Sequence, residues 1–227
     1  MLGGNLDQDL LLKLNTLAGP HPQIFDIADN SLLRGFPIFF ALVALWFSDG
    51  SEKRRARMLA GLLAVCIATI LSVWCQFNIA VHTRPLLDPA LHLKTVDIPW
   101  FKWDRLSSFP SDTATLFFGL ATVVLLENRL AGLFCFLWAA VVITIPRVAF
   151  GFHYPSDLIG SLVLASACVF LLVRFTYPRA FLERALFACR DHMYVVHALL
   201  FVFLTEVSNL FQSVQEIGKD LIRILHS

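Results

Sequence analysis

The residues best suited to chemistry lie in one short segment, 145–157, with the sequence Ile-Pro-Arg-Val-Ala-Phe-Gly-Phe-His-Tyr-Pro-Ser-Asp. Within it, Arg147, His153 and Asp157 form the pattern Arg-x5-His-x3-Asp. A carboxylate that accepts a hydrogen bond from one ring nitrogen of a histidine selects the tautomer and makes the other nitrogen a better nucleophile or base. An arginine offers a planar fork of donors for phosphate oxygens. The spacing therefore predicts a histidine site that handles phosphate.

The same residues also have a plain structural interpretation. Pro155 suits the first turn of a helix, and Asp157 is favourable near a helix N-terminus. In that case Arg147 would anchor the chain at a membrane interface, and His153 would be an ordinary loop histidine. The pattern favours the chemical interpretation, and the structural one stays open.

A second polar segment, 107–115, has the sequence Ser-Ser-Phe-Pro-Ser-Asp-Thr-Ala-Thr. Pro110 followed by Ser111 and Asp112 predicts a capped helix start. The unpaired amides and the positive dipole end of such a start can cradle a phosphate. A capped transmembrane helix without any ligand explains this segment at least as well.

A third segment, 81–88, follows a long apolar stretch and contains Arg84 directly before Pro85. Arg84 can act as a second phosphate clamp. Considered alone, it is better explained as an arginine whose side chain extends to the membrane interface.

The elements that position these segments are predicted to be membrane-spanning helices. Of the 227 residues, 57% are hydrophobic and 15% are charged, with a mean hydropathy of +0.70. Soluble domains have about 45–50% apolar and about 25% charged residues. A membrane span must be helical, because lipid offers no hydrogen-bond partner to the backbone. Six spans are predicted, at 32–47, 58–80, 111–126, 130–146, 157–175 and 193–211.

The predicted fold class is all-α, a polytopic membrane helical bundle of about six transmembrane helices. It comprises an interfacial N-terminal segment (1–31), a transmembrane domain (32–211) and a short amphipathic C-terminal segment (212–227). Basic residues in short loops mark the cytoplasmic side, and they follow the first and fifth spans: Lys53, Arg54, Arg55, Arg57, Arg174, Arg179, Arg184 and Arg190. The three polar segments then share the opposite face. We expect a multi-pass protein of a bacterial inner membrane whose site faces the periplasm or exterior.

Composition and motifs exclude several other classes of protein. The net charge of +1 gives no basic field for nucleic acid, and the sequence has no glycine-rich nucleotide-binding motif. The cysteines form no CxxC pair, so neither a disulfide framework nor a zinc site is indicated. We expect neither a metal nor a cofactor, since arginines and a helix start can neutralise a phosphate.

Taken in order, the three segments resemble the PAP2 (type 2 phosphatidic-acid phosphatase) family, whose signature reads Lys-x6-Arg-Pro, then Pro-Ser-Gly-His, then Ser-Arg-x5-His-x3-Asp. The resemblance covers residues 58–173 and the number of spans. It implies that His153 is a nucleophile that forms a phosphohistidine and that Asp157 orients it. It further implies that the phosphate is bound by two arginines and the start of the third span: Arg84, Arg147, Ser111, Asp112 and Thr113.

Three positions depart from that signature. Phe77 and Pro146 stand where the family has Lys and Ser, and Thr113 stands where it has the histidine that protonates the leaving group. Threonine cannot act as a general acid near neutral pH, and losing one typically costs about 10²–10⁴-fold for a poor leaving group. The leaving group is therefore expected to be good already, such as the phosphate of a lipid diphosphate. Alternatively, Asp112 or His82 substitutes as an auxiliary acid, or the fold serves a different transfer or binding alone.

The predicted function is hydrolysis or transfer of a phosphoryl group on a polyprenyl phosphate or phospholipid by a phosphohistidine mechanism. The expected partner is this membrane lipid or polyprenyl-phosphate substrate. Two alternatives remain. One is a transferase, for example of glycosyl groups, that uses a polyprenyl-phosphate-linked donor, and the other is a non-catalytic lipid-binding membrane protein. Release of free phosphate distinguishes the phosphatase from the transferase.

Overall fold

The computed structural model describes residues 5–48, 51–79, 81–95 and 107–211, which are mostly helical and contain no strand. The principal helices are α1 (Asn5–Ala18), α2 (Gln23–Asp29), α3 (Ser31–Phe47), α4 (Glu52–Asn78), α5 (Asp112–Glu127), α6 (Arg129–Trp138), α7 (Ile145–Ala149), α8 (Pro155–Arg174), α9 (Thr176–Ala188) and α10 (Met193–Ser208). Short helical turns are η1 (Pro85–Leu87), η2 (Pro89–Leu91), the π-helical η3 (Ala139–Thr144) and η4 (Arg190–His192).

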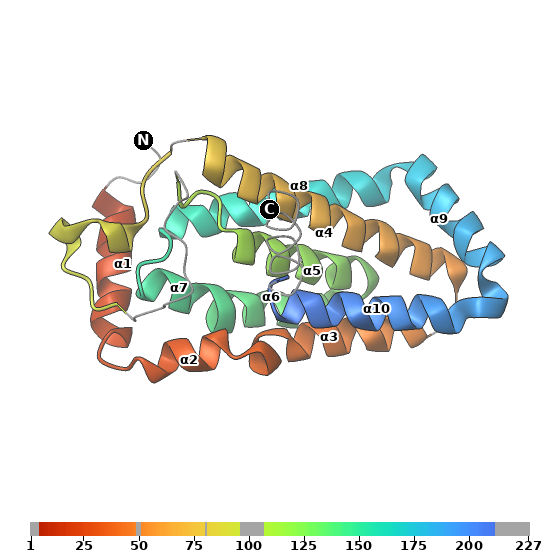
Figure 1. Ribbon diagram of the computed structural model, residues 1–227, viewed down its shortest axis with the longest axis horizontal. Coiled ribbons are helices and arrows are strands. Elements are labelled where there is room, and N and C mark those ends of the chain that lie inside the picture. The colour runs from red at the N-terminus through yellow and green to blue at the C-terminus, as the bar shows by residue number, and fades with distance from the viewer. Residues whose placement is uncertain (1–4, 49–50, 80, 96–106, 212–227) are drawn as a thin grey trace, which may run out of the picture.

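The long helices run side by side along one axis, and α1 lies across one end of the bundle (Figure 1). Helix α5 is central: it packs against α4, α6 and α8, and every residue from 113 to 124 is buried. The close approach of α4 to α5 depends on Gly61, where an added Cβ would lie 2.7 Å from Cγ2 of Val123. A side chain at position 61 would therefore force the two helices apart, because densely packed interiors leave no space for it.

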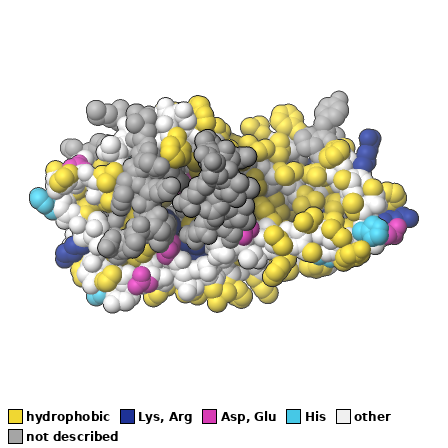
Figure 2. Space-filling view, in the orientation of Figure 1, with side chains coloured by type: hydrophobic (Ala, Val, Ile, Leu, Met, Phe, Trp, Pro, Cys, Tyr) yellow, Lys and Arg dark blue, Asp and Glu magenta, His cyan; other side chains and the backbone are white. Residues whose placement is uncertain are grey.

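Several helices are long and apolar enough to cross a membrane. Among the described residues, α4, α8 and the continuous helical run Arg129–Ala149 are each long and apolar enough to be a span. Two pairs of helices that are bent at a short break raise the number of candidate spans to five if each pair counts as one span. Hydrophobic side chains cover most of the right-hand half of the molecule in Figure 2, and the charged ones there gather at the tip. The predicted all-α membrane bundle is thus confirmed. The third predicted span, 111–126, corresponds to α5, which has 16 residues and is enclosed by its neighbours.

The fourth predicted span ends later than expected. Helix α6 continues through η3 into α7, which ends at Ala149. In a regular helix the ring of Pro146 would clash with the carbonyl group four residues earlier. The wider π turn, in which Ile145 N–H donates to Ala140 O, accommodates the ring. Arg147, which follows the predicted span 130–146, therefore lies inside α7 and not in a loop.

The end of the bundle far from α1 carries the tight turn that joins the third and fourth predicted spans. Helix α5 ends at Glu127, and Asn128 caps α6 by accepting a hydrogen bond from Ala131 N–H. The Glu127 carboxylate binds Arg57 at 2.8 Å and Arg54 at 3.2 Å, both from the basic start of α4. These ion pairs join the first basic loop to the centre of the bundle.

The N-terminal helices pack over the end of the bundle where α7 ends and α8 begins. Leu11 of α1 is buried against Val148 and Tyr154. Phe25 of α2 stacks on Phe152, with ring centroids 5.2 Å apart. The predicted division of the chain into three parts stays a prediction, and its C-terminal part, 212–227, lies outside the described residues.

Candidate active site

The three polar segments meet at the end of the bundle covered by α1 and α2. Leu86 N–H donates to Gly151 O (2.9 Å), and Ser108 N–H donates to His82 O (3.2 Å). Gly151 has a φ of +79°, and an added Cβ there would lie 2.7 Å from Cδ1 of Leu93. Glycine adopts such a left-handed conformation at no steric cost. The segment after α4 is thereby held between the loops that precede α5 and α8.

His153 is buried, and two oxygen atoms define the orientation of its ring. Nδ1 lies 3.0 Å from Ser108 O and 3.4 Å from Oδ2 of Asp157. Because a backbone carbonyl only accepts hydrogen bonds, this contact assigns the proton to Nδ1. Nε2 then carries the lone pair, and it lies 3.4 Å from Nη1 of Arg84. The arrangement presents a nucleophilic nitrogen beside a cation.

Arg84 is also buried and is held from two sides. Its Nη1 donates to Phe152 O (2.9 Å), and its Nη2 donates to Oε1 of Gln76 (3.2 Å). The Gln76 amide nitrogen in turn donates to Pro110 O. These bonds fix the guanidinium next to Nε2 of His153, where it can bind the oxygens of a phosphoryl group.

Asp157 caps a helix and also faces His153. Helix α8 begins at Pro155, and Oδ2 of Asp157 caps it by accepting from Tyr154 N–H (2.9 Å). The same carboxylate faces His153, and its Oδ1 lies 3.3 Å from Nε2 of His82, although these two atoms are not aligned for a hydrogen bond. The oxygen that caps the helix, Oδ2, is also the one that lies 3.4 Å from Nδ1 of His153.

The electrostatic surroundings keep His153 neutral. Burial lowers the pKa of its imidazole, the Asp157 carboxylate opposes this effect, and the positive charge of Arg84 adds to it. A histidine with a lowered pKa is unprotonated at neutral pH, as a nucleophile must be.

The start of α5 contains Ser111, Asp112 and Thr113. Oγ of Ser111 accepts from Ala114 N–H (3.3 Å), and Oδ1 of Asp112 accepts from Thr113 N–H (2.9 Å). Ser161 of α8 donates its hydroxyl to Ser111 O (2.9 Å). The capping interpretation is therefore observed. The backbone amides of Thr113 and Ala114, at the helix start that the phosphate-cradle hypothesis assigns to a ligand, therefore donate hydrogen bonds to side-chain oxygens.

Arg147 is buried in α7 and contacts the N-terminal helices. Its Nη2 donates to Oδ1 of Asp29 (3.1 Å), and the same oxygen accepts from Nη1 of Arg34 (2.8 Å). The structure thus links Arg147 to α2 and α3, while Arg84 contacts His153 directly.

Sequence reasoning missed three residues of this site: Gln76, Ser108 and Asp29. Gln76 carries a usable signal, because a polar residue inside an apolar span is often functional. Ser108 contributes its backbone carbonyl to His153, a group that every residue type has. Asp29 lies 118 residues from Arg147 in the chain, and such a distance leaves no pattern of local spacing.

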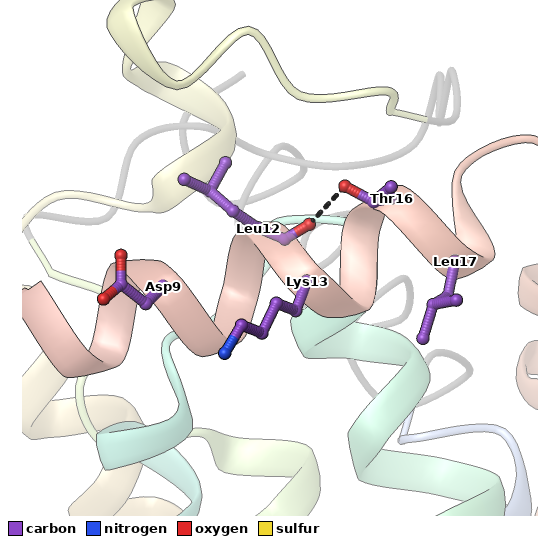
Figure 3. Close-up of a pocket in the computed structure, with 5 residues that line it drawn as sticks. All are labelled: Asp9, Leu12, Lys13, Thr16 and Leu17. Carbon is purple, nitrogen blue, oxygen red and sulfur yellow. Dashed lines mark hydrogen bonds between the residues drawn. The ribbon is translucent and has the colours of Figure 1, made fainter.

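Other parts of the described structure offer weaker sites. No group of three or more His, Cys, Asp or Glu side chains that could hold a metal ion occurs among the described residues. A hollow on α1 is lined by five residues of that one helix, in which Thr16 Oγ1 donates to Leu12 O (Figure 3). Ligand sites normally collect polar groups that converge from several elements. The histidine site satisfies that criterion, and the hollow does not.

Comparisons with known proteins identify the family. The chain is 25% identical over 162 residues to "Putative undecaprenyl-diphosphatase YbjG" of Escherichia coli (strain K12), covering 70% of this chain and 77% of that protein. It is 29% identical over 139 residues to "Undecaprenyl-diphosphatase BcrC" of Bacillus subtilis (strain 168), covering 60% of this chain and 65% of that protein. No solved structure matches significantly. Residues 59–181, which include Arg84, His153 and Asp157, match the family model of the PAP2 superfamily, and the chain belongs to this superfamily.

Proposed function

We propose that this protein is a phosphatase that removes the terminal phosphate of a polyprenyl diphosphate through a phosphohistidine intermediate. The observation that carries the proposal is the orientation of His153. Its Nδ1 is engaged by Ser108 O and Asp157, and its Nε2 lies 3.4 Å from the guanidinium of Arg84. The names of the two relatives supply the substrate class.

In the first step, the lone pair on Nε2 of His153 attacks the terminal phosphorus. The bond from phosphorus to the bridging oxygen breaks, and the lipid monophosphate leaves with the electron pair. Arg84 and Arg147 neutralise the charge on the phosphoryl oxygens. The ring gains positive charge in the intermediate, and the Asp157 carboxylate beside Nδ1–H stabilises it.

In the second step, water attacks the phosphorus and the bond from phosphorus to nitrogen breaks. The oxygen and both hydrogens of the water leave in dihydrogen phosphate, and His153 returns to its neutral form. Thr113, in place of the general acid, is compatible with this substrate, because a lipid monophosphate needs little protonation to leave.

We further propose that the site faces the exterior of a bacterial inner membrane. Supporting this orientation, the basic start of α4 lies at the end of the bundle opposite the site, with Arg54 and Arg57 bound to Glu127. Basic residues flank spans on the cytoplasmic side. The site at the other end then faces outward.

The test is phosphate release by the purified full chain in detergent from polyprenyl diphosphate, polyprenyl monophosphate and phosphatidic acid. A His153→Ala variant serves as the control. Release from the diphosphate that is lost in the variant supports the proposal. Release that survives in the variant contradicts the assignment of the nucleophile.

Absence of release from all three substrates would favour a transferase that uses a polyprenyl-phosphate-linked donor. Thr113 is the observation behind that second candidate, because a reaction in which the lipid phosphate is itself the leaving group needs no general acid. Consumption of a sugar-linked polyprenyl-phosphate donor without release of free phosphate would identify the transferase.

A further inference from the structure

The N-terminal helices, which lie outside the family match, hold the segment that carries the candidate catalytic residues at three points. Asp7 of α1 accepts from Ser156 N–H (3.1 Å), next to Asp157. The Asn15 amide of α1 donates to Ala149 O (2.7 Å). Asp29 of α2 accepts from Arg147. The first two contacts hold the backbone, and the third holds a charged side chain.

The contact at Asp29 has an unusual charge balance. Its Oδ1 accepts from both Arg34 and Arg147, whose side chains are 4% and 9% exposed. Two buried guanidinium groups thus share one carboxylate, and the cluster carries an excess positive charge. Burying an uncompensated charge is costly, so such a cluster favours a further anion. A substrate phosphate provides one.

Arg147 keeps most of its hydrogen-bonding capacity in this arrangement. A guanidinium has five N–H donors, and the described residues accept one hydrogen bond from Arg147, at Asp29. Arg34 is anchored more firmly, since its Nη2 also donates to Ser208 O (2.6 Å) of α10. Asp29 therefore connects a fixed arginine to one whose remaining donors are available to a ligand.

We propose that Asp29 is a positioning residue that orients Arg147 for binding the substrate phosphate, with Arg34 holding Asp29 in place. The inference rests on the proposed function, in which Arg147 binds phosphoryl oxygens. Without the carboxylate, two adjacent guanidinium groups would repel each other, and Arg147, which has fewer hydrogen bonds than Arg34, would turn away. The phosphatase site of this chain then extends beyond the family match to α2 and α3.

The experiment compares Asp29→Asn with Asp29→Glu and with Asp26→Asn. Asp26 lies on the same helix, and its side chain is exposed. We expect D29N to lower kcat/KM for farnesyl diphosphate by about 10- to 100-fold, mainly through KM, because small displacements of a binding group are costly. D29E should recover part of the loss, and D26N should match the wild type.

A double-mutant cycle with Arg147→Gln separates positioning from general support of the fold. If Asp29 acts through Arg147, D29N should change kcat/KM less than about twofold in the R147Q background. Fully additive losses would overturn the proposal. So would a lower KM in D29N, which would make Asp29 a competitor of the phosphate.

Binding of farnesyl diphosphate to the His153→Ala protein tests the same coupling without turnover. Weaker binding by the H153A/D29N double variant than by H153A, measured at a temperature at which thermal unfolding shows both proteins to be folded, is the expected result. Unchanged binding would overturn the role of Asp29. This measurement does not require phosphate release, so failure of the proposed hydrolysis and failure of the positioning role remain distinguishable.

Discussion

Replacing Asp157 with asparagine separates its two roles, because asparagine keeps an oxygen to cap α8 at Tyr154 N–H but lacks the charge. Oδ2 lies 3.4 Å from Nδ1 of His153, so two unit charges there would interact by about 5 kcal/mol at an effective dielectric constant of about 20. The transition state that forms the phosphohistidine develops only part of that charge on the ring. We therefore expect D157N to lose about 3–4 kcal/mol of transition-state stabilisation, or about 10²–10³-fold in kcat.

The assay is phosphate release from farnesyl diphosphate in detergent, with thermal unfolding measured on the same preparations. Asp191→Asn is the matched control, because its side chain is 83% exposed in η4 and outside the site. A D157N protein that melts like the wild type and keeps more than about a tenth of its kcat would refute the reasoning. Asp157 would then be a helix cap without a part in the reaction.

The pH dependence of D157N gives an independent readout. His153 must be unprotonated to attack, so activity falls at low pH as the ring gains a proton. The Asp157 carboxylate raises the pKa of His153, and removing its charge lowers that pKa. The acid limb of the residual activity should therefore move to lower pH. A shift to higher pH would contradict the assigned contact.

Three further variants test other parts of the site and the fold. Arg84→Gln should lower kcat/KM and move the acid limb to higher pH, because the Arg84 charge lowers the pKa of His153; a pH series on the purified variant measures both. Thr113→His should raise hydrolysis of a polyprenyl monophosphate at least about tenfold relative to the diphosphate, because a general acid helps a poor leaving group; equal effects on both substrates would contradict the role given to the leaving group. Glu127→Gln should destabilise the protein by about 1–3 kcal/mol, because its carboxylate is 4% exposed and bound to two arginines. Thermal unfolding beside Glu183→Gln, whose partly exposed ion pair at 3.9 Å contributes less than about 1 kcal/mol, checks this value.

The fold class could be predicted because lipid permits few backbone structures. Apolar stretches of span length had to be helices, and α8 and α4 begin two and six residues before the predicted starts, 157 and 58. The predicted end of the fourth span, at Pro146, was less accurate. A proline normally ends a helix, but here the π turn η3 allows the helix to continue through Pro146. Hydropathy does not report the hydrogen-bond shift that makes a π turn.

The candidate site was predictable where its geometry is local. His153 and Asp157 are four residues apart, so the turn that begins α8 brings the carboxylate back to the imidazole. Arg84 could be located only by its place in the family signature, because its contact with His153 spans 69 residues. The bond from Asp29 to Arg147 lies outside that signature, and only the packing of α2 against α7 reveals it.

The contacts of His82 bear on how the protein works without the family's general acid. In the proposed mechanism an auxiliary acid must reach the leaving oxygen, which departs from the phosphorus on the side away from Nε2 of His153. The ring nitrogens of His82 instead lie 3.0 Å from Oγ of Ser108 and 3.3 Å from Oδ1 of Asp157. Both of those residues contact His153 through Nδ1, on the other side of the ring. We therefore expect that His82, which lies beside the carboxylate, does not protonate the leaving group, and this expectation favours a substrate whose leaving group needs no proton.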